Sequence, residues 1–180
     1  DLNIGFAQGH SSFPGYLDEI RISKGIARWI TNFTPPTSAY DSAILSSTTV
    51  TGSGASASAR LEYRTFIDSS LNKTITAYGN TQINTAIKKF GIGSVKFDGT
   101  GDYLSMPADH PDFVFGTGDF TIDMWVYFNS VSTGVLYDGR PVLGEGLFPI
   151  LYVSGGVLYY HTDSANRITG STLSTGTWYH

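Results

Sequence analysis

Cysteine is absent from this chain of 180 residues, and several kinds of chemistry are excluded with it. Neither a disulfide nor a thiolate metal site nor a cysteine nucleophile can form. A chain of this length buries about 70% of the surface that its unfolded form exposes, so a core can hold without cross-links. The length suits one domain, or one domain and a fraction of another.

Charge is also scarce. Charged residues make up 14% of the chain, with 11 Lys and Arg against 15 Asp and Glu. The basic residues are scattered, and Lys88-Lys89 is their only adjacent pair. Nucleic-acid binding needs clustered basic charge to displace counterions, so we expect no nucleic-acid partner. No apolar run approaches the ~20 residues of a membrane-spanning helix, so we expect no membrane insertion.

Small and aromatic residues are abundant instead. Gly, Ser and Thr supply 61 residues, aromatics make up 14%, and there are only five Lys and three Glu. Turn formers that alternate with aromatic and β-branched residues predict an all-β, antiparallel domain. The clearest strand is Phe120–Phe128, in which every second residue, from Phe120 to Phe128, is apolar. That period of two predicts one face in the core and one amphipathic face.

Short strands recur along the rest of the chain. Gly155-Gly156 separates two apolar runs, and Asp98-Gly99 and Asp138-Gly139 are hairpin-type turn signals. Strands at such spacing favour a β-sandwich over a parallel sheet. The segment from Ile83 to Phe90 fits either a short helix or an extended chain. The other expected strands are Leu2–Gly5, Tyr16–Ile22, Leu61–Phe66, Thr74–Tyr78, Ser94–Phe97, Tyr103–Met106, Val135–Tyr137, Ile150–Val153, Val157–His161 and Trp178–His180.

Composition divides the chain into three parts. Residues 31–60 contain a Pro pair, Pro35-Pro36, and then a stretch of Ser, Thr, Gly and Ala that predicts a linker. Residues 1–30 precede it and residues 61–180 follow it. The first part holds about two strands, which is too little to fold alone. We therefore expect it to form a hairpin of Leu2–Gly5 with Tyr16–Ile22, whose Ile20 and Ile22 pack on a larger sheet.

Catalytic patterns are weak. Glycoside hydrolysis needs two carboxylates that flank the scissile bond. The three glutamates, Glu19, Glu62 and Glu145, are isolated, and neighbours such as Asp18 and Glu19 face opposite sides of a regular strand. The four histidines are dispersed, and no nucleophile elbow occurs. We therefore expect no enzyme activity, and a structural hydrogen-bonding role for Asp18.

Two long phrases resemble a known family. Residues 15–37, which begin Gly-Tyr-Leu-Asp-Glu-Ile, resemble the closing hairpin of laminin-G-like domains of the concanavalin A-like lectin/glucanase superfamily. Residues 90–126, with Phe97-Asp98-Gly99 and Phe120-Thr121-Ile122, resemble the opening half of the same domain, and residues 175–180 the start of its second half. The resemblance covers about 1–37 and 66–180. It implies a jelly-roll sandwich, as found in phage tail-fibre and virion-surface proteins.

The order of these phrases is unusual, because the end of a domain precedes its beginning. One explanation is that the chain is a segment of a longer protein with tandem repeats. In that case residues 1–30 are the C-terminal hairpin of one repeat, 31–60 a linker, and 61–180 the N-terminal part of the next. The other explanation is a permuted or exchanged sandwich, in which residues 1–30 complete the sheets of 61–180 in the same chain or a neighbouring one.

Two binding sites are candidates. Asp98 and Asp102 flank a Gly-rich loop that either forms an ordinary turn or binds calcium, which laminin-G-like domains often hold at a sandwich rim. Aromatic and polar residues near strand ends could instead bind a sugar, or else cover core or subunit surfaces. The members of this carbohydrate set are Tyr137, Asp138, Arg140, Tyr159, Tyr160 and Asp163.

These expectations combine into one functional hypothesis. The resemblance implies a non-catalytic adhesion or structural module of a virion-surface or tail-fibre protein, placed on the virion or outside the cell, that recognises host-surface glycans. Its other partners would be copies of itself, in a homo-oligomer, or neighbouring virion proteins. The alternatives are a purely structural fibre or capsid-decorating module without a ligand and, behind it, a polysaccharide-acting hydrolase or lyase.

Overall fold

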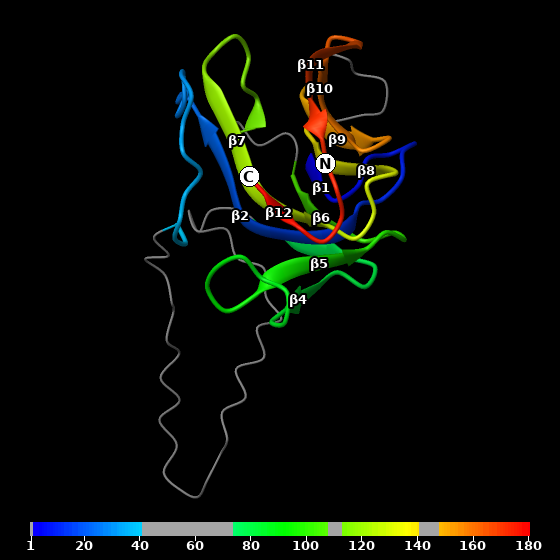
Figure 1. The fold of residues 1–180 in the computed structure, drawn as a ribbon. Coiled ribbons are helices and arrows are strands. Elements are labelled where there is room, and N and C mark those ends of the chain that lie inside the picture. The colour runs from blue at the N-terminus through cyan, green and yellow to red at the C-terminus, as the bar shows by residue number, and fades with distance from the viewer. Residues whose placement is uncertain (1, 41–73, 108–112, 141–147) are drawn as a thin grey trace, which may run out of the picture.

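The computed structural model describes residues 2–40, 74–107, 113–140 and 148–180 (Figure 1). Within these residues the chain is all-β and forms two antiparallel sheets, as the composition predicts. The strands are β1 (Leu2–Ile4), β2 (Pro14–Lys24), β3 (Thr76–Tyr78), β4 (Gln82–Asn84), β5 (Ser94–Asp98), β6 (Tyr103–Met106), β7 (Phe120–Phe128), β8 (Thr133–Asp138), β9 (Ile150–Ser154), β10 (Val157–Thr162), β11 (Ala165–Thr172) and β12 (Trp178–Tyr179).

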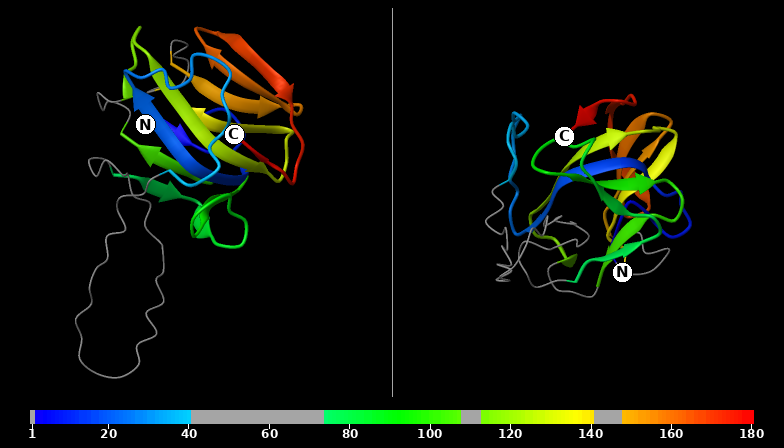
Figure 2. Two further views of the ribbon diagram at one scale, coloured as in Figure 1. Left: turned by 60° about the vertical axis from the view of Figure 1, so that its left-hand side comes forward. Right: turned by 90° about the horizontal axis from the view of Figure 1, so that it is seen from below.

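The strands are distributed between a larger and a smaller sheet. Seven strands pair in the order β11-β10-β9-β8-β1-β6-β3, and five pair in the order β12-β7-β2-β5-β4. Figure 2 shows β2 and β7 side by side in the smaller sheet, with the β9–β11 strands in the other layer. Both sheets therefore mix strands from the two ends of the chain.

The core lies between the two sheets and draws on both of them. Leu2 and Leu104 enter it from the larger sheet, and Leu17 and Phe97 from the smaller one. The alternation along β7 is confirmed, because Met124, Val126 and Phe128 are buried in this cluster. Each such side chain contributes about 1.5–3 kcal/mol through burial of its apolar surface. A shared core between two antiparallel sheets gives the molecule the character of a β-sandwich.

The expected hairpin between the first two strands is wrong. β1 pairs with β6 and β8 in the larger sheet, and β2 pairs with β5 and β7 in the smaller one. The chain crosses between the sheets through residues 5–13. There Gly5 has a φ of +92°, and a Cβ at this position would lie 2.6 Å from the Phe97 ring. A hairpin of two strands alone could not cover its own apolar faces. In the structure β1 and β2 each have a neighbouring strand on both edges, within sheets large enough to share a core. Ile20 and Ile22 pack against the shared core, as expected.

Two strands differ from the sequence-based expectation. Gln82–Asn84 is extended as β4 and pairs with β5, so the ambiguous segment begins as a strand. Ala165–Thr172 forms β11, which was not expected because its residues are mostly polar or small. The expected strand Leu61–Phe66 and the Ser/Thr/Gly/Ala stretch lie outside the described residues.

Candidate functional site

The structure buries the first half of the carbohydrate set. Tyr137 is fully buried in the core, and its hydroxyl has no hydrogen-bond partner. Burial raises the pKa of this phenol above its ordinary value. Asp138 is also buried, and the Arg140 guanidinium donates to it at 2.9 and 2.8 Å. These three side chains hold the end of β8 and present no open ring face to a sugar.

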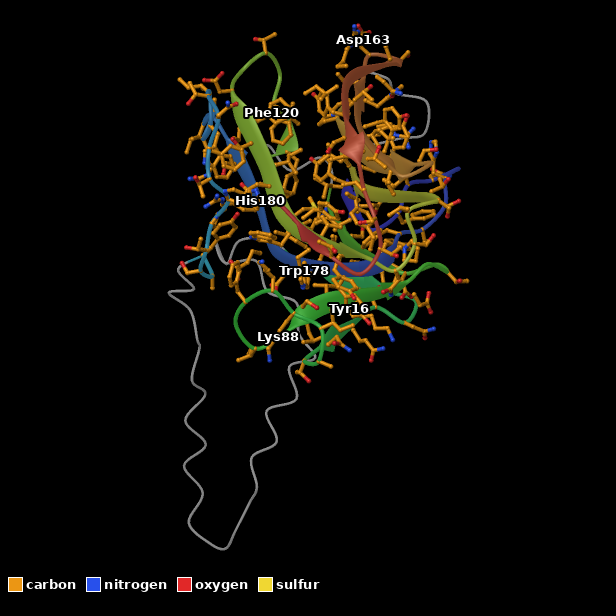
Figure 3. All side chains as sticks on the ribbon, in the orientation of Figure 1. Tyr16, Lys88, Phe120, Asp163, Trp178 and His180 are labelled. Atoms are coloured by element: carbon orange, nitrogen blue, oxygen red, sulfur yellow. The ribbon has the colours of Figure 1, made fainter. Side chains whose placement is uncertain are left out.

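The second half of the set is divided between the two faces of the larger sheet. Tyr159 and Tyr160 are neighbours on β10, so their side chains point to opposite faces. Asp163 lies at the tip of the β10–β11 hairpin, where its carboxylate accepts a bond from Arg167 at 2.5 Å (Figure 3). The six residues therefore do not form one site.

Tyr159 belongs to a different group, which we call the outer tyrosine patch: Tyr152, Tyr159, His161 and Asn166. The rings of Tyr152 and Tyr159 stack with centroids 5.1 Å apart and an interplanar angle of 22°. The Tyr152 hydroxyl donates to the Asn166 side-chain oxygen at 3.0 Å, and His161 Nδ1 lies 2.8 Å from the same oxygen. Strands β9, β10 and β11 thus place two rings and two polar side chains on one face.

Asp98 and Asp102 lie together, and turn hydrogen bonds engage both of them. The two oxygens of Asp102 accept bonds from the backbone N–H groups of Asn80 and Asp98, at 2.5 and 2.7 Å. The oxygens of Asp98 accept from the Asn80 side chain and the Thr100 backbone N–H, and these two bonds, the first above all, lower the pKa of its carboxyl. Asp102 is buried, whereas Asp98 is exposed. This geometry gives the pair a structural role in the turn, and calcium binding here stays a prediction.

Asp18 and Glu19 lie at an irregularity in β2. The pairing with β7 shifts by one residue between Asp18 and Arg21, and Glu19 has a φ of +50°, so the strand bulges there. The bulge breaks the regular alternation on which the opposite-facing expectation rested. Asp18 accepts backbone bonds from Glu19, Lys89 and Phe90, which is the structural role expected for it. Burial, the largest effect, raises the pKa of both carboxyls. Beside the bulge lies a small cavity of about 130 Å³.

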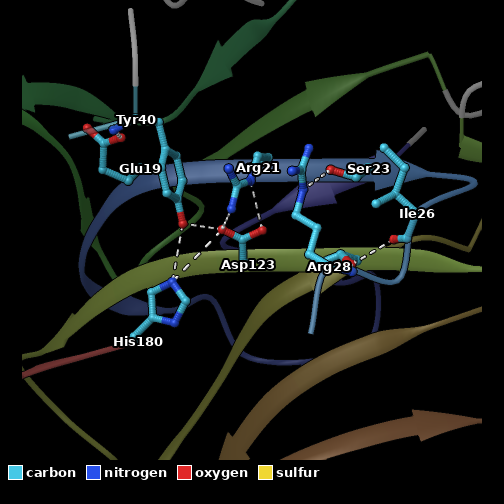
Figure 4. A network of polar contacts seen from close by, with 9 residues as sticks. Glu19, Arg21, Ser23, Ile26, Arg28, Tyr40, Asp123 and His180 are labelled. Atoms are coloured by element: carbon cyan, nitrogen blue, oxygen red, sulfur yellow. Dashed lines mark hydrogen bonds and ion pairs between the residues drawn. The ribbon is translucent and has the colours of Figure 1, made fainter. Parts of the chain in front are cut away.

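A polar network covers the outer face of the smaller sheet (Figure 4). The Arg21 guanidinium donates two bonds to Asp123, at 3.0 and 3.1 Å. The Tyr40 hydroxyl donates to Asp123 Oδ1, and His180 Nε2 lies 3.2 Å from the same hydroxyl. Burial, together with the bond to the Asp123 carboxylate, raises the pKa of Tyr40, and burial lowers the pKa of His180. The network joins β2, β7, residue 40 and residue 180.

Residues 25–40, which we call the strap, cross this network. The Arg28 backbone N–H donates to the Thr121 hydroxyl, and the Arg28 side chain donates to Ser23. Trp29 and Phe33 stack with centroids 4.4 Å apart, and each lies edge-on to the His180 ring at 5.7 Å. The strap therefore covers polar side chains with aromatic ones.

The sequence reasoning missed both the network and the outer tyrosine patch. Period-two patterning placed Asp123 on the less apolar face of its strand, and this was the one available signal for the network. Nothing local connects Tyr40 with His180, which are 140 positions apart. In the patch, Asn166 belongs to a strand that the sequence did not indicate.

Comparison with known proteins gave no match to a protein-family model, a curated protein or a solved structure. Among the described residues, no group of three or more His, Asp or Glu side chains could hold a metal ion. The same part of the chain contains no helix long and apolar enough to cross a membrane.

Proposed function

We propose that this chain is a non-catalytic module that attaches a virion-surface or tail-fibre protein to host-surface glycans. The fold in this proposal is the laminin-G-like, concanavalin A-like jelly roll, and the two antiparallel sheets around one core support it. The outer tyrosine patch is the observation that carries the binding function. We therefore propose that the sugar binds on the outer face of β9–β11 and not at the end of β8, where Tyr137 and Asp138 are buried.

The patch has the chemistry that a sugar ring requires. Aromatic rings offer an apolar face, and a few placed polar groups fix the orientation of a ligand. One ring face of Tyr159 stacks on Tyr152. On the side away from Tyr152, the residue paired with Tyr159 across the strands is Thr169 of β11, which is small and exposed. The second face of Tyr159 is therefore the contact surface, with His161 and Asn166 beside it to bind hydroxyls.

Binding of the intact chain to an array of bacterial surface polysaccharides tests the proposal. We expect the Tyr159→Ala variant to lose about 5- to 150-fold in affinity, taking for the sugar the about 1–3 kcal/mol that a nucleobase gains by stacking on an aromatic side chain. Tyr78→Ala is the matched control, because Tyr78 is exposed and stacked on Tyr103 at the opposite end of the same sheet. Absence of binding, or an equal loss in both variants, would contradict the patch as the site.

A purely structural role is the second candidate, and exposed apolar residues on the strap favour it. Ile26, Ile30 and Phe33 are 48%, 85% and 45% exposed within eight positions. Large apolar side chains grouped on a surface often mark protein contacts. In this case the chain would associate with copies of itself in light-scattering measurements, and Ile30→Ser would shift the mass toward the monomer. A monomer at all concentrations would exclude this self-association.

A further inference from the structure

Side chains from three separate parts of the chain converge on the Tyr40 ring. Arg21 comes from the centre of β2, Asp123 from β7, and His180 from the residue after β12 (Figure 4). The Arg21 guanidinium lies 3.8 Å from the centre of the Tyr40 ring, and the Tyr40 hydroxyl meets the Asp123 carboxylate and the His180 imidazole. The sheet thus contacts Tyr40 on its ring face and at its hydroxyl.

Two of these contacts suit a sugar hydroxyl as well as a phenol, because a carboxylate accepts from a hydroxyl and an imidazole nitrogen donates or accepts. The packing of Arg21 on the Tyr40 ring is a cation–π contact that needs an aromatic ring, so toward a sugar the guanidinium would act through its N–H donors. Asp123 is almost fully buried, and Arg21 fixes it through two hydrogen bonds, so the acceptor is already oriented. The carboxylate would meet another hydroxyl in the same way as it meets the phenol of Tyr40.

One buried donor near this network has no hydrogen-bond partner. Trp125 lies two residues beyond Asp123 on the same face of β7, and its ring is 5.1 Å from that of His180. Trp125 as a whole residue is 93% buried, and its Nε1–H has no hydrogen-bond partner. A buried donor without a partner costs about 1–3 kcal/mol. A phenol carries a single hydroxyl, whereas a sugar carries several, and one of these can accept from Trp125.

The strap that brings Tyr40 to the sheet is lightly attached. The strap makes aromatic contacts with His180 and Arg21. Its hydrogen bonds lie near its two ends, at Gly25, Ile26 and Arg28 and at Tyr40. Ile30 is 85% exposed, so the middle of the strap buries little apolar surface there. Segments with few buried contacts open at low cost.

From these observations we infer that the outer face of the smaller sheet holds a second saccharide site, formed by Arg21, Asp123, Trp125 and His180, which Tyr40 occupies as an internal competitor. The ligand is a sugar ring with neighbouring hydroxyls, the same class as in the proposed function, but the site lies on the other sheet. A strap closed nine-tenths of the time lowers the apparent affinity about tenfold. Removal of Tyr40 should restore that affinity.

The test is a titration of the intact chain with the methyl glycosides of glucose, galactose, mannose and N-acetylglucosamine. Tyr40→Ala should bind at least one of them about tenfold more tightly than the original chain, and Tyr78→Ala should not. Adding Asp123→Asn to Tyr40→Ala should abolish the gain. A gain that survives Asp123→Asn, or no gain with any glycoside, overturns the inference.

A second readout does not depend on the folding of the Asp123 variant. In Tyr40→Ala, the indole N–H signal of Trp125 should shift in nitrogen–proton NMR spectra as the glycoside is added, while the signal of Trp178 shifts less. An unmoved Trp125 signal at saturating glycoside also overturns the inference. Tyr159→Ala separates the two proposals, because it removes binding at the outer tyrosine patch and leaves the gain in Tyr40→Ala intact.

Discussion

Asp18 shows how one buried carboxylate can organise a neighbouring loop. Its oxygens accept from the backbone N–H groups of Lys89 and Phe90 at 2.8 and 3.0 Å, more than 70 positions away, and from Glu19 at 2.9 Å. These bonds tie the loop after β4 to the bulge of β2. Asp18 therefore has a structural role in joining these two segments.

Replacement of Asp18 should destabilise the fold in a graded way. Asp18→Ala leaves three partly buried backbone donors without their acceptor, so we expect a loss of about 2–4 kcal/mol in the free energy of unfolding. Asp18→Asn keeps one acceptor oxygen and should lose less. Asp163→Asn, at an exposed hairpin tip, should change it little, since Asn also tolerates the left-handed conformation of this residue. Urea unfolding measures all three, and a neutral Asp18→Ala would contradict the role assigned to these bonds.

His180 makes stability depend on pH in a defined direction. Burial lowers its pKa below the ordinary value of 6.5, with the Asp123 carboxylate opposing this shift and Arg21 adding to it. The unfolded chain therefore binds a proton at a higher pH than the folded chain does. This contribution to stability is complete above pH 6.5 and is lost as the pH falls from 6.5 toward the folded pKa.

The His180→Gln variant isolates this effect. Between pH 7.5 and pH 5.5, the original chain should lose more unfolding free energy than His180→Gln does. The raised pKa values of Asp18 and Glu19 act in the opposite direction, because they add stability as the pH falls. Both proteins share this contribution, so it cancels when the loss in one is subtracted from the loss in the other. Urea unfolding at the two pH values measures these losses. If both proteins lose the same unfolding free energy between pH 7.5 and pH 5.5, His180 is not buried in its neutral form.

At the scale of elements, the sequence predicts a strand well where apolar residues alternate regularly and recognisable turn residues bound the strand. The bounds of β7 match the prediction because nine residues alternate without interruption. The turn between β9 and β10 follows from Gly155-Gly156, both of which have positive φ. The next turn uses Asp163 and Ser164 in the same left-handed region, at φ values of 52° and 58°. Without glycine that turn carried no clear signal, so β11 was not expected.

Strand β11 also shows how an exposed edge is protected. It pairs with β10 alone among the described strands, and the register shifts twice along that pairing. Bulges and charged side chains on an edge strand hinder pairing with another molecule. Arg167, at one of the bulges, is the one charged residue in the strand. Its exposed ion pair with Asp163 adds little stability, so its main effect is to discourage association.

Arg167→Val should therefore promote association without unfolding the chain. We expect the free energy of unfolding to change by less than about 1 kcal/mol, as is usual for exposed ion pairs. Sedimentation velocity should show larger species at concentrations where the original chain is unchanged. Asp163→Asn breaks the same ion pair but keeps the charge on β11, so it should remain like the original chain. Association of both variants to the same extent would assign the effect to the ion pair.

At the scale of the molecule, composition predicts the all-β class but not which strands become neighbours. Patterning found β1 and β2 and predicted that Ile20 and Ile22 face a sheet. Pairing depends on contacts between distant segments, and these placed the two strands in different sheets. The site was harder to predict for the same reason. The patch and the network each join residues from several strands, while the predicted carbohydrate set grouped residues by their proximity in sequence.

The central positions of β1 and β2 lead to a prediction about folding. β1 lies between β8 and β6, and β2 lies between β7 and β5, so removal of residues 1–24 divides both sheets. The chain also loses four fully or nearly fully buried side chains, Leu2, Ile4, Phe13 and Leu17. At about 1.5–3 kcal/mol each, their sum is comparable to the whole 5–15 kcal/mol stability of a typical domain.

We therefore expect residues 25–180 alone to show neither a cooperative thermal transition nor near-ultraviolet circular dichroism. A peptide of residues 1–24 should restore both when it is added in excess, because the two strands can pair without being covalently joined to the rest. Removal of residues 174–180 is the matched control. It deletes the edge strand β12 and should lower the transition temperature while keeping unfolding cooperative, since an edge strand has a neighbour on one side only. Cooperative unfolding of residues 25–180 without the peptide would mean that β3–β12 form a sandwich on their own, with β1 and β2 as additions to it.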